Sequence, residues 1–309
     1  MGMAHLLITV DTEISNFPNG MGLWGRIGNE YWGLTRLLDT FEDIELKGTF
    51  FLDVYAQTDF DIADQRRAAE LISRRGHDLQ LHTHPGPAFE RARDQLRHYT
   101  LAEQEEILEF GCRRIEEWSG TRPVLHRAGD WAADHNSLLA LRTKGFRADF
   151  SASPWSKNCG LDHGAINGNG WTHLEGMLCG IGTHYIDRLT GRTRRVDLGG
   201  VSFREAIDML SRGIDPFFLT LHSFSLLRYN KSRTRFTPNT DYIRHLHRFC
   251  EIAREQWGYQ TLPALEAVNA VGKLTSESLP WANLPMSQAV SSVAGVMNSV
   301  RGRLSDLMR

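Results

Sequence analysis

Two histidines separated by a single residue, His82 and His84, follow an apolar run that has the character of a strand. Side chains alternate along a strand, so both imidazoles project to the same side of an extended backbone. Histidine nitrogen is among the commonest protein ligands of zinc. The chain has 13 histidines, and the same pair could also be two solvent-facing residues of a loop. The pair indicates a metal site once other ionisable clusters accompany it.

An acidic pair, Asp11 and Glu13, ends an earlier apolar run in the same way. Both carboxylates share one side of an extended segment, so one could bind a metal while the other stays ionised as a base. The alternative is a pair of turn acids that cap the following loop. With two histidines, one carboxylate makes the ligand set of a catalytic zinc site with an open position for water. Such a site polarises a carbonyl group and lowers the pKa of water.

Three further ionisable residues end or border strand-like runs. The guanidinium of Arg127 could orient a buried carboxylate such as Asp11 and lower its pKa, or form a surface ion pair. His222 ends a strongly apolar run, where an unsatisfied imidazole would be costly. It is either a core histidine with one hydrogen bond or a general acid for a leaving amine. Asp149 is the candidate to hold His222 protonated.

Strand-like runs alternate with helical patterns along most of the chain, which is typical of βα units around a mostly parallel sheet. The expected strands are residues 6–10, 48–52, 78–82, 124–126, 149–151, 217–222 and 259–262. The expected helices are residues 29–42, 63–75, 101–118, 134–144, 202–212, 239–257 and 263–270. Thr100 and Glu103 have the spacing of a capping box at the start of the third helix. This order predicts a metal hydrolase with its site at one mouth of a strand barrel.

The barrel is expected to span residues 1–271 and to be followed by a tail, residues 272–309. Residues 152–200 are rich in Gly, Asn, His and Trp, and predict a substrate-covering insertion or irregular hairpins. In the tail, a linker precedes residues 286–308, which have apolar residues at helical spacing. That amphipathic helix could dock on the domain or a partner subunit, including a second copy, or lie in a membrane interface.

Composition limits the function classes. At 309 residues and 41% hydrophobic, the chain can bury a sizeable core. Its net charge is −2, with 35 basic and 37 acidic side chains intermixed, so no nucleic-acid-binding face is expected. The four cysteines form no CxxC pattern, which disfavours a zinc finger or a thioredoxin-like site. Neither a secretory signal nor a membrane span is visible, and we expect a cytoplasmic location.

The order of the motifs resembles that of the NodB-homology polysaccharide deacetylases, carbohydrate esterase family 4, over about residues 5–268. The matching motifs are Asp-x-Glu after the first strand, Gly-His-Asp-x-x-x-His-x-His-Pro after the third, then Arg-Ala-Gly-x-Trp and Leu-x-Leu-His. Two of them depart from the commoner form: Thr12 separates the two acids, and the histidines are two residues apart instead of four. The resemblance implies a distorted (β/α)7 barrel and a divalent metal, usually zinc, used to remove acetyl groups from sugars.

The resemblance also assigns roles to residues. It implies a base at Asp11, metal ligands at Glu13, His82 and His84, an arginine at Arg127 that steers the base, an acid at Asp149, and a histidine acid at His222. Trp131 and Leu219 match positions that wall the acyl pocket, and Asp130 lies beside Trp131 in the third motif.

We therefore expect the enzyme to remove an N-acyl group by hydrolysis, and we expect that group to be an acetyl. The expected substrate is an amino sugar that is nucleotide- or lipid-linked. The expected cofactor is Zn²⁺, or another divalent ion such as Co²⁺ or Ni²⁺. An enzyme of the same fold that cleaves formamides or ureides is one alternative. An inactive barrel that only binds carbohydrate is another.

Overall fold

The computed structural model describes residues 4–14, 17–166, 168–199, 202–271, 281–283 and 285–287. Within these ranges, a curved sheet contains seven parallel strands in the order β12-β1-β4-β5-β6-β7-β9. Their bounds are β1 His5–Thr12, β4 Thr49–Asp53, β5 Asp78–Thr83, β6 Leu125–Ala128, β7 Ala148–Asp149, β9 Met177–Ile181 and β12 Phe217–His222. The antiparallel strand β8 (Gly168–Leu174) follows β9 and contacts β12, which nearly closes a barrel.

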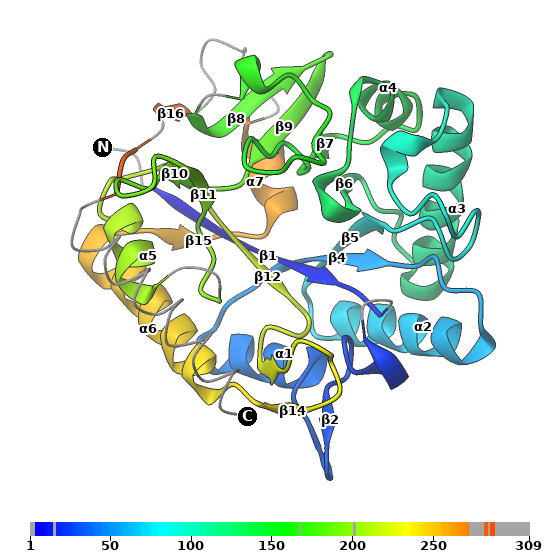
Figure 1. The fold of residues 1–309 in the computed structure, drawn as a ribbon, viewed down its shortest axis with the longest axis horizontal. Helices are drawn as coiled ribbons and strands as arrows, with labels where there is room; N and C mark the ends of the chain where they lie inside the picture. Colours follow the sequence, from blue (N-terminus) through cyan, green and yellow to red (C-terminus); the bar gives the residue numbers. More distant parts are fainter. Residues whose placement is uncertain are drawn as a thin grey trace.

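Seven α-helices are described, and they surround the sheet: α1, α2, α3, α4, α5 and α6 are visible around its periphery in Figure 1. They are α1 Leu34–Asp43, α2 Asp59–Arg74, α3 Leu101–Ser119, α4 His135–Thr143, α5 Phe203–Leu210, α6 Thr240–Trp257 and α7 Ala264–Val271. The distorted (β/α)7 barrel predicted from the sequence is confirmed. No described helix has both the length and the apolar character needed to cross a membrane.

Successive side chains of a strand point to opposite faces of the sheet, which divides the apolar core into two layers. One cluster includes Leu6, Ile8 and Val10 of β1 and packs against the helices. A second, smaller cluster fills the barrel interior and includes Leu7, Phe51, Leu125, Phe150 and Phe218. Residues of α7 join the inner cluster, so this helix covers the end at which the strands begin. The opposite end, where the strands finish, is left for polar side chains.

Several predicted elements differ from the observed ones. The helix expected over 29–42 begins only at Leu34, because a short hairpin of β2 (Arg26–Ile27) and β3 (Glu30–Tyr31) turns at Gly28. Gly28 has φ +62°, a conformation that favours glycine. The capping box at Thr100 and Glu103 is confirmed by hydrogen bonds in both directions.

Two irregular regions are hairpins. The segment 152–200, expected to be an insertion or irregular hairpins, contains the hairpin β8–β9, whose strand β9 belongs to the main sheet, and a second hairpin, β10 (His184–Ile186) with β11 (Thr193–Arg195). A further hairpin, β13 (Leu227–Tyr229) with β14 (Phe236–Pro238), was not expected.

Most of the expected tail helix lies outside the described residues, which include only 286 and 287 of the range 286–308. Within the expected linker, Trp281–Asn283 forms strand β16, antiparallel to β8. The strand β15 (Gln260–Thr261) pairs with the start of β1.

His77, interpreted from the sequence as structural, makes stability depend on pH. Its Nδ1 accepts a hydrogen bond from the Gly48 N–H at 3.2 Å, and its ring contacts Phe41 and Phe50. Burial, with the charge of Lys47 acting in the same direction, lowers the pKa of His77 to about 4. An unfolded histidine has a pKa of about 6.5.

The unfolded chain therefore binds more protons at this position between pH 6.5 and 4, so the free energy of unfolding falls as the pH drops through that window. We expect His77→Asn, whose side-chain oxygen can still accept from Gly48, to remove this part of the pH dependence. Urea unfolding of both proteins at pH 7 and pH 5 measures it. Identical losses of stability in the two proteins would show that His77 does not contribute.

Candidate active site

The ends of β1 and β5 bring the three predicted metal ligands together. Glu13 Oε1 lies 3.2 Å from His82 Nε2 and 3.6 Å from His84 Nε2. One donor atom from each of the three residues lies within 4.8 Å of the other two, and all three side chains are buried. The short spacing of the two histidines still lets them meet. Alternate residues of β5 face the barrel interior, and His82 and His84 both follow that alternation.

The donor set fits a divalent metal ion. His84 Nε2 is buried and has no hydrogen-bond partner in the part of the chain that the structure describes. The other nitrogen of each ring is occupied: His82 Nδ1 lies 2.9 Å from the Arg127 carbonyl oxygen, and His84 Nδ1 lies 2.9 Å from Asp94 Oδ2. This arrangement aims both Nε2 atoms at Glu13, just as hydrogen bonds to the other ring nitrogen orient histidine ligands in metal centres. Two imidazoles and one carboxylate form the ligand set of a catalytic zinc site.

The charges of this cluster shift the pKa values of Glu13 and His84 in opposite directions. Burial would raise the pKa of Glu13, but the neighbouring imidazoles of His82 and His84 lower it well below its usual range. Burial would lower the pKa of His84, but Asp94 and Glu13 raise it well above its usual range. Metal binding through His84 must therefore displace a proton, and the metal affinity should rise with pH.

Asp94, which the sequence interpretation did not include, orients one ligand. Its Oδ2 faces His84, and its Oδ1 accepts a hydrogen bond from the Gly86 N–H at 3.2 Å. We expect Asp94→Asn to weaken metal binding by about 10–100-fold, the usual effect of losing a carboxylate that orients a histidine ligand. Competition with a chromophoric chelator measures the affinity, with Asp43→Asn on the exposed face of α1 as the matched control. Equal affinities would contradict the role of Asp94.

The loop after β6 packs directly on His84. A Cβ added at Gly129 would lie 2.5 Å from His84 Cε1 and Nε2, so this position needs glycine for close approach. The next two residues, Asp130 and Trp131, have φ +55° and +62°, which is uncommon for residues other than glycine. Such sparsely populated backbone conformations cluster at functional sites.

A buried ion pair lies beside the ligand cluster. Arg127 Nη1 donates to Asp11 Oδ1 at 2.6 Å, and its Nη2 donates to Thr9 Oγ1 at 2.9 Å. Burial would raise the pKa of Asp11, but the charge of Arg127, with smaller contributions from His82 and His222, lowers it. Asp11 is therefore held ionised next to the predicted metal ligands, as a base requires.

His222 stands at the solvent side of Asp11. Its Nε2 lies 4.0 Å from Asp11 Oδ2, and its side chain is 30% exposed. The ring stacks on Phe224 with centroids 4.8 Å apart. Asp11, Glu13 and His222 also bring donor atoms within 4.8 Å of one another. Asp11, the Glu–His–His cluster and His222 thus lie together at the carboxyl ends of the strands.

The interpretation of Asp149 as the partner of His222 is wrong. Asp149 is paired in register with His126, and its Oδ1 lies 2.8 Å from His126 Nδ1. Its other oxygen accepts from the Ser151 N–H at 2.8 Å. Neighbouring Phe150 points into the barrel, so Asp149 points out toward the helices. Among the described residues, no hydrogen bond or ion pair joins Asp149 to His222.

The interpretation of Leu219 as a wall of the acyl pocket is also wrong. Leu219 is three positions before His222, so the two side chains lie on opposite faces of β12. It pairs in register with Ile8 and belongs to the layer between sheet and helices.

The other two predicted substrate contacts lie near the pocket. The ring of Trp131 is 5.0 Å from the guanidinium carbon of Arg127 and 5.4 Å from the ring of Trp155. Asp130 is exposed, and its Oδ2 accepts from Gln95 Nε2 at 3.2 Å.

Asp53 is a second residue that the sequence interpretation missed. It ends β4, pairs in register with His82, and is 1% exposed. Burial raises its pKa to about 6, against the opposing charges of His84 and His82. Its position at the end of a strand-like run is the same signal that identified Asp11 and His82.

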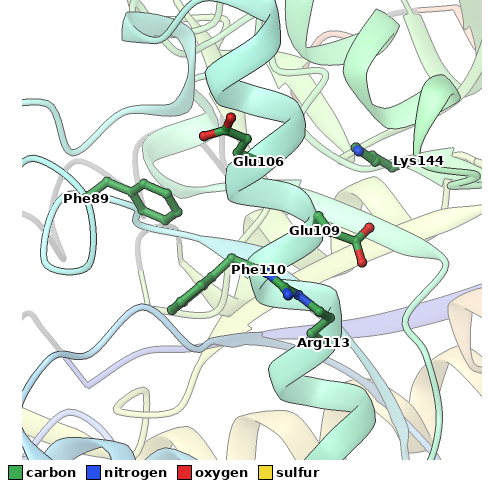
Figure 2. Close-up of a pocket in the computed structure, with 6 residues that line it drawn as sticks. All are labelled: Phe89, Glu106, Glu109, Phe110, Arg113 and Lys144. Atoms are coloured by element: carbon green, nitrogen blue, oxygen red, sulfur yellow. The ribbon is translucent and has the colours of Figure 1, made fainter.

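A groove on the surface along α3 is separate from this site. Figure 2 shows Glu106, Glu109 and Arg113 projecting from α3, with Phe89 and Lys144 from neighbouring segments. Its volume is about 320 Å³, and none of the candidate site residues lines it.

Comparison with solved structures identifies the fold. A candidate polysaccharide deacetylase from Mycobacterium smegmatis superposes with a TM-score of 0.58 and 18% identity, over 89% of this chain and 93% of that one. The chitin deacetylase from Colletotrichum lindemuthianum gives 0.49 and 11%, over 91% and 94%. The carbohydrate esterase family 4 domain of a xylanase from the hindgut metagenome of Trinervitermes trinervoides gives 0.47 and 12%, over 91% and 98%. No protein-family model and no curated protein matches the sequence.

Proposed function

We propose that this chain, which has the NodB-like fold of polysaccharide deacetylases, is a metal-dependent hydrolase that removes an N-acetyl group from an amino sugar. The observation that carries the proposal is the convergence of a Glu–His–His cluster with a buried, ionised carboxylate. A structural metal site needs no such neighbouring base, whereas hydrolysis does.

Each residue of the pocket has a chemical role in this proposal. A divalent ion held by Glu13, His82 and His84 would polarise the acyl carbonyl and lower the pKa of water. Asp11 accepts the proton of the attacking water, and Arg127 keeps Asp11 ionised and oriented. His222, on the open side of Asp11, donates a proton to the nitrogen that leaves.

Trp131 is the side chain that we place against the acyl group. It lies above Arg127, on the loop that also packs against His84. Asp130, on the same exposed loop, is placed at the substrate's edge. An aromatic surface suits the methyl group of an acetyl and the apolar face of a sugar ring.

The test is metal content and product release. Purified wild-type protein should contain about one zinc-like ion per chain, and His82→Ala and His84→Ala should lose both the metal and acetate release from N-acetylated sugars. The exposed His98→Ala serves as the control. Metal retained in both variants would refute the ligand assignment. No metal after addition of zinc, cobalt or nickel would favour an inactive carbohydrate-binding barrel, and release of formate or ammonia would favour the small-amide hydrolase.

A further inference from the structure

A cavity of about 260 Å³ adjoins the candidate active site. Its lining includes Ile14, Phe17, Asp53, Asp61, Pro87 and Arg91. Ile14 follows the predicted ligand Glu13, Pro87 lies on the loop that follows His84, and Asp53 pairs in register with His82. The cavity is therefore a neighbour of the ligand cluster.

Asp53 gives this cavity a buried polar wall. One of its oxygens accepts a hydrogen bond from the Tyr55 N–H at 3.2 Å. The other oxygen has no hydrogen-bond partner among the described residues, although the side chain is 1% exposed. This oxygen is not among the fully buried unpaired atoms of the described residues, and Asp53 lines the cavity, so a donor of a ligand there could bond to it. Asp61, the other acid of the wall, already accepts from Thr58 Oγ1 at 2.6 Å.

One arginine lines this cavity, and a second lies over the ring of a lining residue. Arg91 lines it, is exposed, and has no ion pair or hydrogen bond among the described residues. The guanidinium of Arg233 lies over the ring of Phe17, which also lines the cavity, at 4.7 Å. Guanidinium groups are suited to bidentate binding of phosphate.

The second arginine belongs to a basic, ordered hairpin. Residues 223–239 contain four cations, Arg228, Lys231, Arg233 and Arg235, and no acid. Tyr229 and Phe236 of this hairpin pack against Phe17, at 4.9 and 5.8 Å between ring centroids. Asn230 Oδ1 accepts from the backbone N–H groups of Thr234 and Arg235, which fixes the turn. Arg228 is paired with Asp241 outside the hairpin, and Arg233 is the cation that the hairpin places against Phe17.

We propose that this cavity is the sugar subsite of the proposed hydrolase and that its preferred occupant is a sugar phosphate. Asp53 accepts hydrogen bonds from hydroxyl groups of the ring, and Arg91 and Arg233 bind the phosphate. The volume is below the roughly 300–1,000 Å³ of sites for drug-sized ligands, which matches one monosaccharide unit. The inference rests on the proposed function. Nucleotide-linked and lipid-linked sugars share this phosphate, and the experiment distinguishes them.

The experiment measures binding with probes that lack an amide and cannot be hydrolysed. Isothermal titration calorimetry of the zinc-loaded protein compares glucose with glucose 1-phosphate. We expect the phosphate to tighten binding at least about tenfold, the effect of one charge-assisted hydrogen bond, and less at high salt. Arg91→Ala should remove most of this preference, and Arg91→Lys should restore part of it. Arg113→Ala, in the groove of Figure 2, should leave it unchanged.

Asp53→Asn should weaken both probes by a similar factor, because the hydroxyl contacts are common to both. Unchanged binding of both probes would remove Asp53 from the subsite. Equal affinity for the two probes, or a preference that survives the double replacement of Arg91 and Arg233 by Ala, would overturn the proposal. Tighter binding of UDP-glucose or of a polyprenyl phosphate glucose supports it and identifies the carrier.

A separate acetate-release assay distinguishes this proposal from the proposed function. Arg91-dependent phosphate preference without acetate release from any N-acetylated sugar would keep the subsite and refute the deacetylase. Acetate release without that preference would keep the deacetylase and refute the subsite.

Discussion

Replacement of Asp11 by asparagine is expected to lower kcat by roughly 10²–10⁴-fold, the usual contribution of a general base. Asparagine keeps the shape of the side chain and can still accept from Arg127, whose Nη1 donates to Asp11 Oδ1 at 2.6 Å. It cannot take a proton from water. The barrel should therefore stay folded while the chemical step slows.

The measurement is single-turnover acetate release together with metal content. Because Asp11 is assigned as base and not as ligand, the variant should keep the metal that His82→Ala loses. Loss of metal from Asp11→Asn would instead make Asp11 part of the second cluster, with Glu13 and His222, as a ligand. Normal turnover would exclude Asp11 from the mechanism. The exposed Asp43→Asn controls for a general effect of removing an acid.

The sequence was sufficient to predict the direction of side chains that depends on one strand alone. Alternation puts Asp11 beside Glu13, and His82 beside His84, on one face. No information from another strand is needed for this. The parallel arrangement then brings the strand ends to one edge of the barrel, so the ligand cluster follows from local pattern and fold class together.

The two wrong interpretations, of Leu219 and of Asp149, have different causes. Leu219 could have been excluded from the sequence, because an odd separation from His222 puts it on the opposite face of β12. Asp149 could not, because its short strand β7 has only two residues and gives no alternation of its own. Its outward direction depends on the register with His126, which is a long-range contact.

The missed elements depend on contacts that no local pattern encodes. Asp94 lies in an irregular loop and reaches His84 through a turn closed by Gly86. The β13–β14 hairpin has strands of three residues each, too short for a periodic signal. Its packing on Phe17 joins segments more than 200 residues apart.

Removal of the Arg127 guanidinium is expected to affect both stability and chemistry. Arg127→Met keeps much of the volume of a fully buried side chain whose guanidinium lies over the Phe51 ring at 4.4 Å. It leaves the carboxylate of Asp11 buried without its main partner. Breaking such a pair costs about 3–5 kcal/mol of unfolding free energy. Urea unfolding measures the loss, with Arg113→Met on the exposed face of α3 as control.

The pH profile tests the same ion pair independently. Burial raises the pKa of Asp11 and Arg127 is the largest influence that lowers it, so the pKa should rise in Arg127→Met. The base is active when ionised, and the acidic limb of kcat/KM should therefore move to higher pH. The double variant Asp11→Asn/Arg127→Met has no unpaired charge and should recover much of the stability lost by Arg127→Met alone. A double variant that is less stable than either single one would mean that Arg127 stabilises the barrel by packing, and that Asp11 gains its ionisation from the histidines.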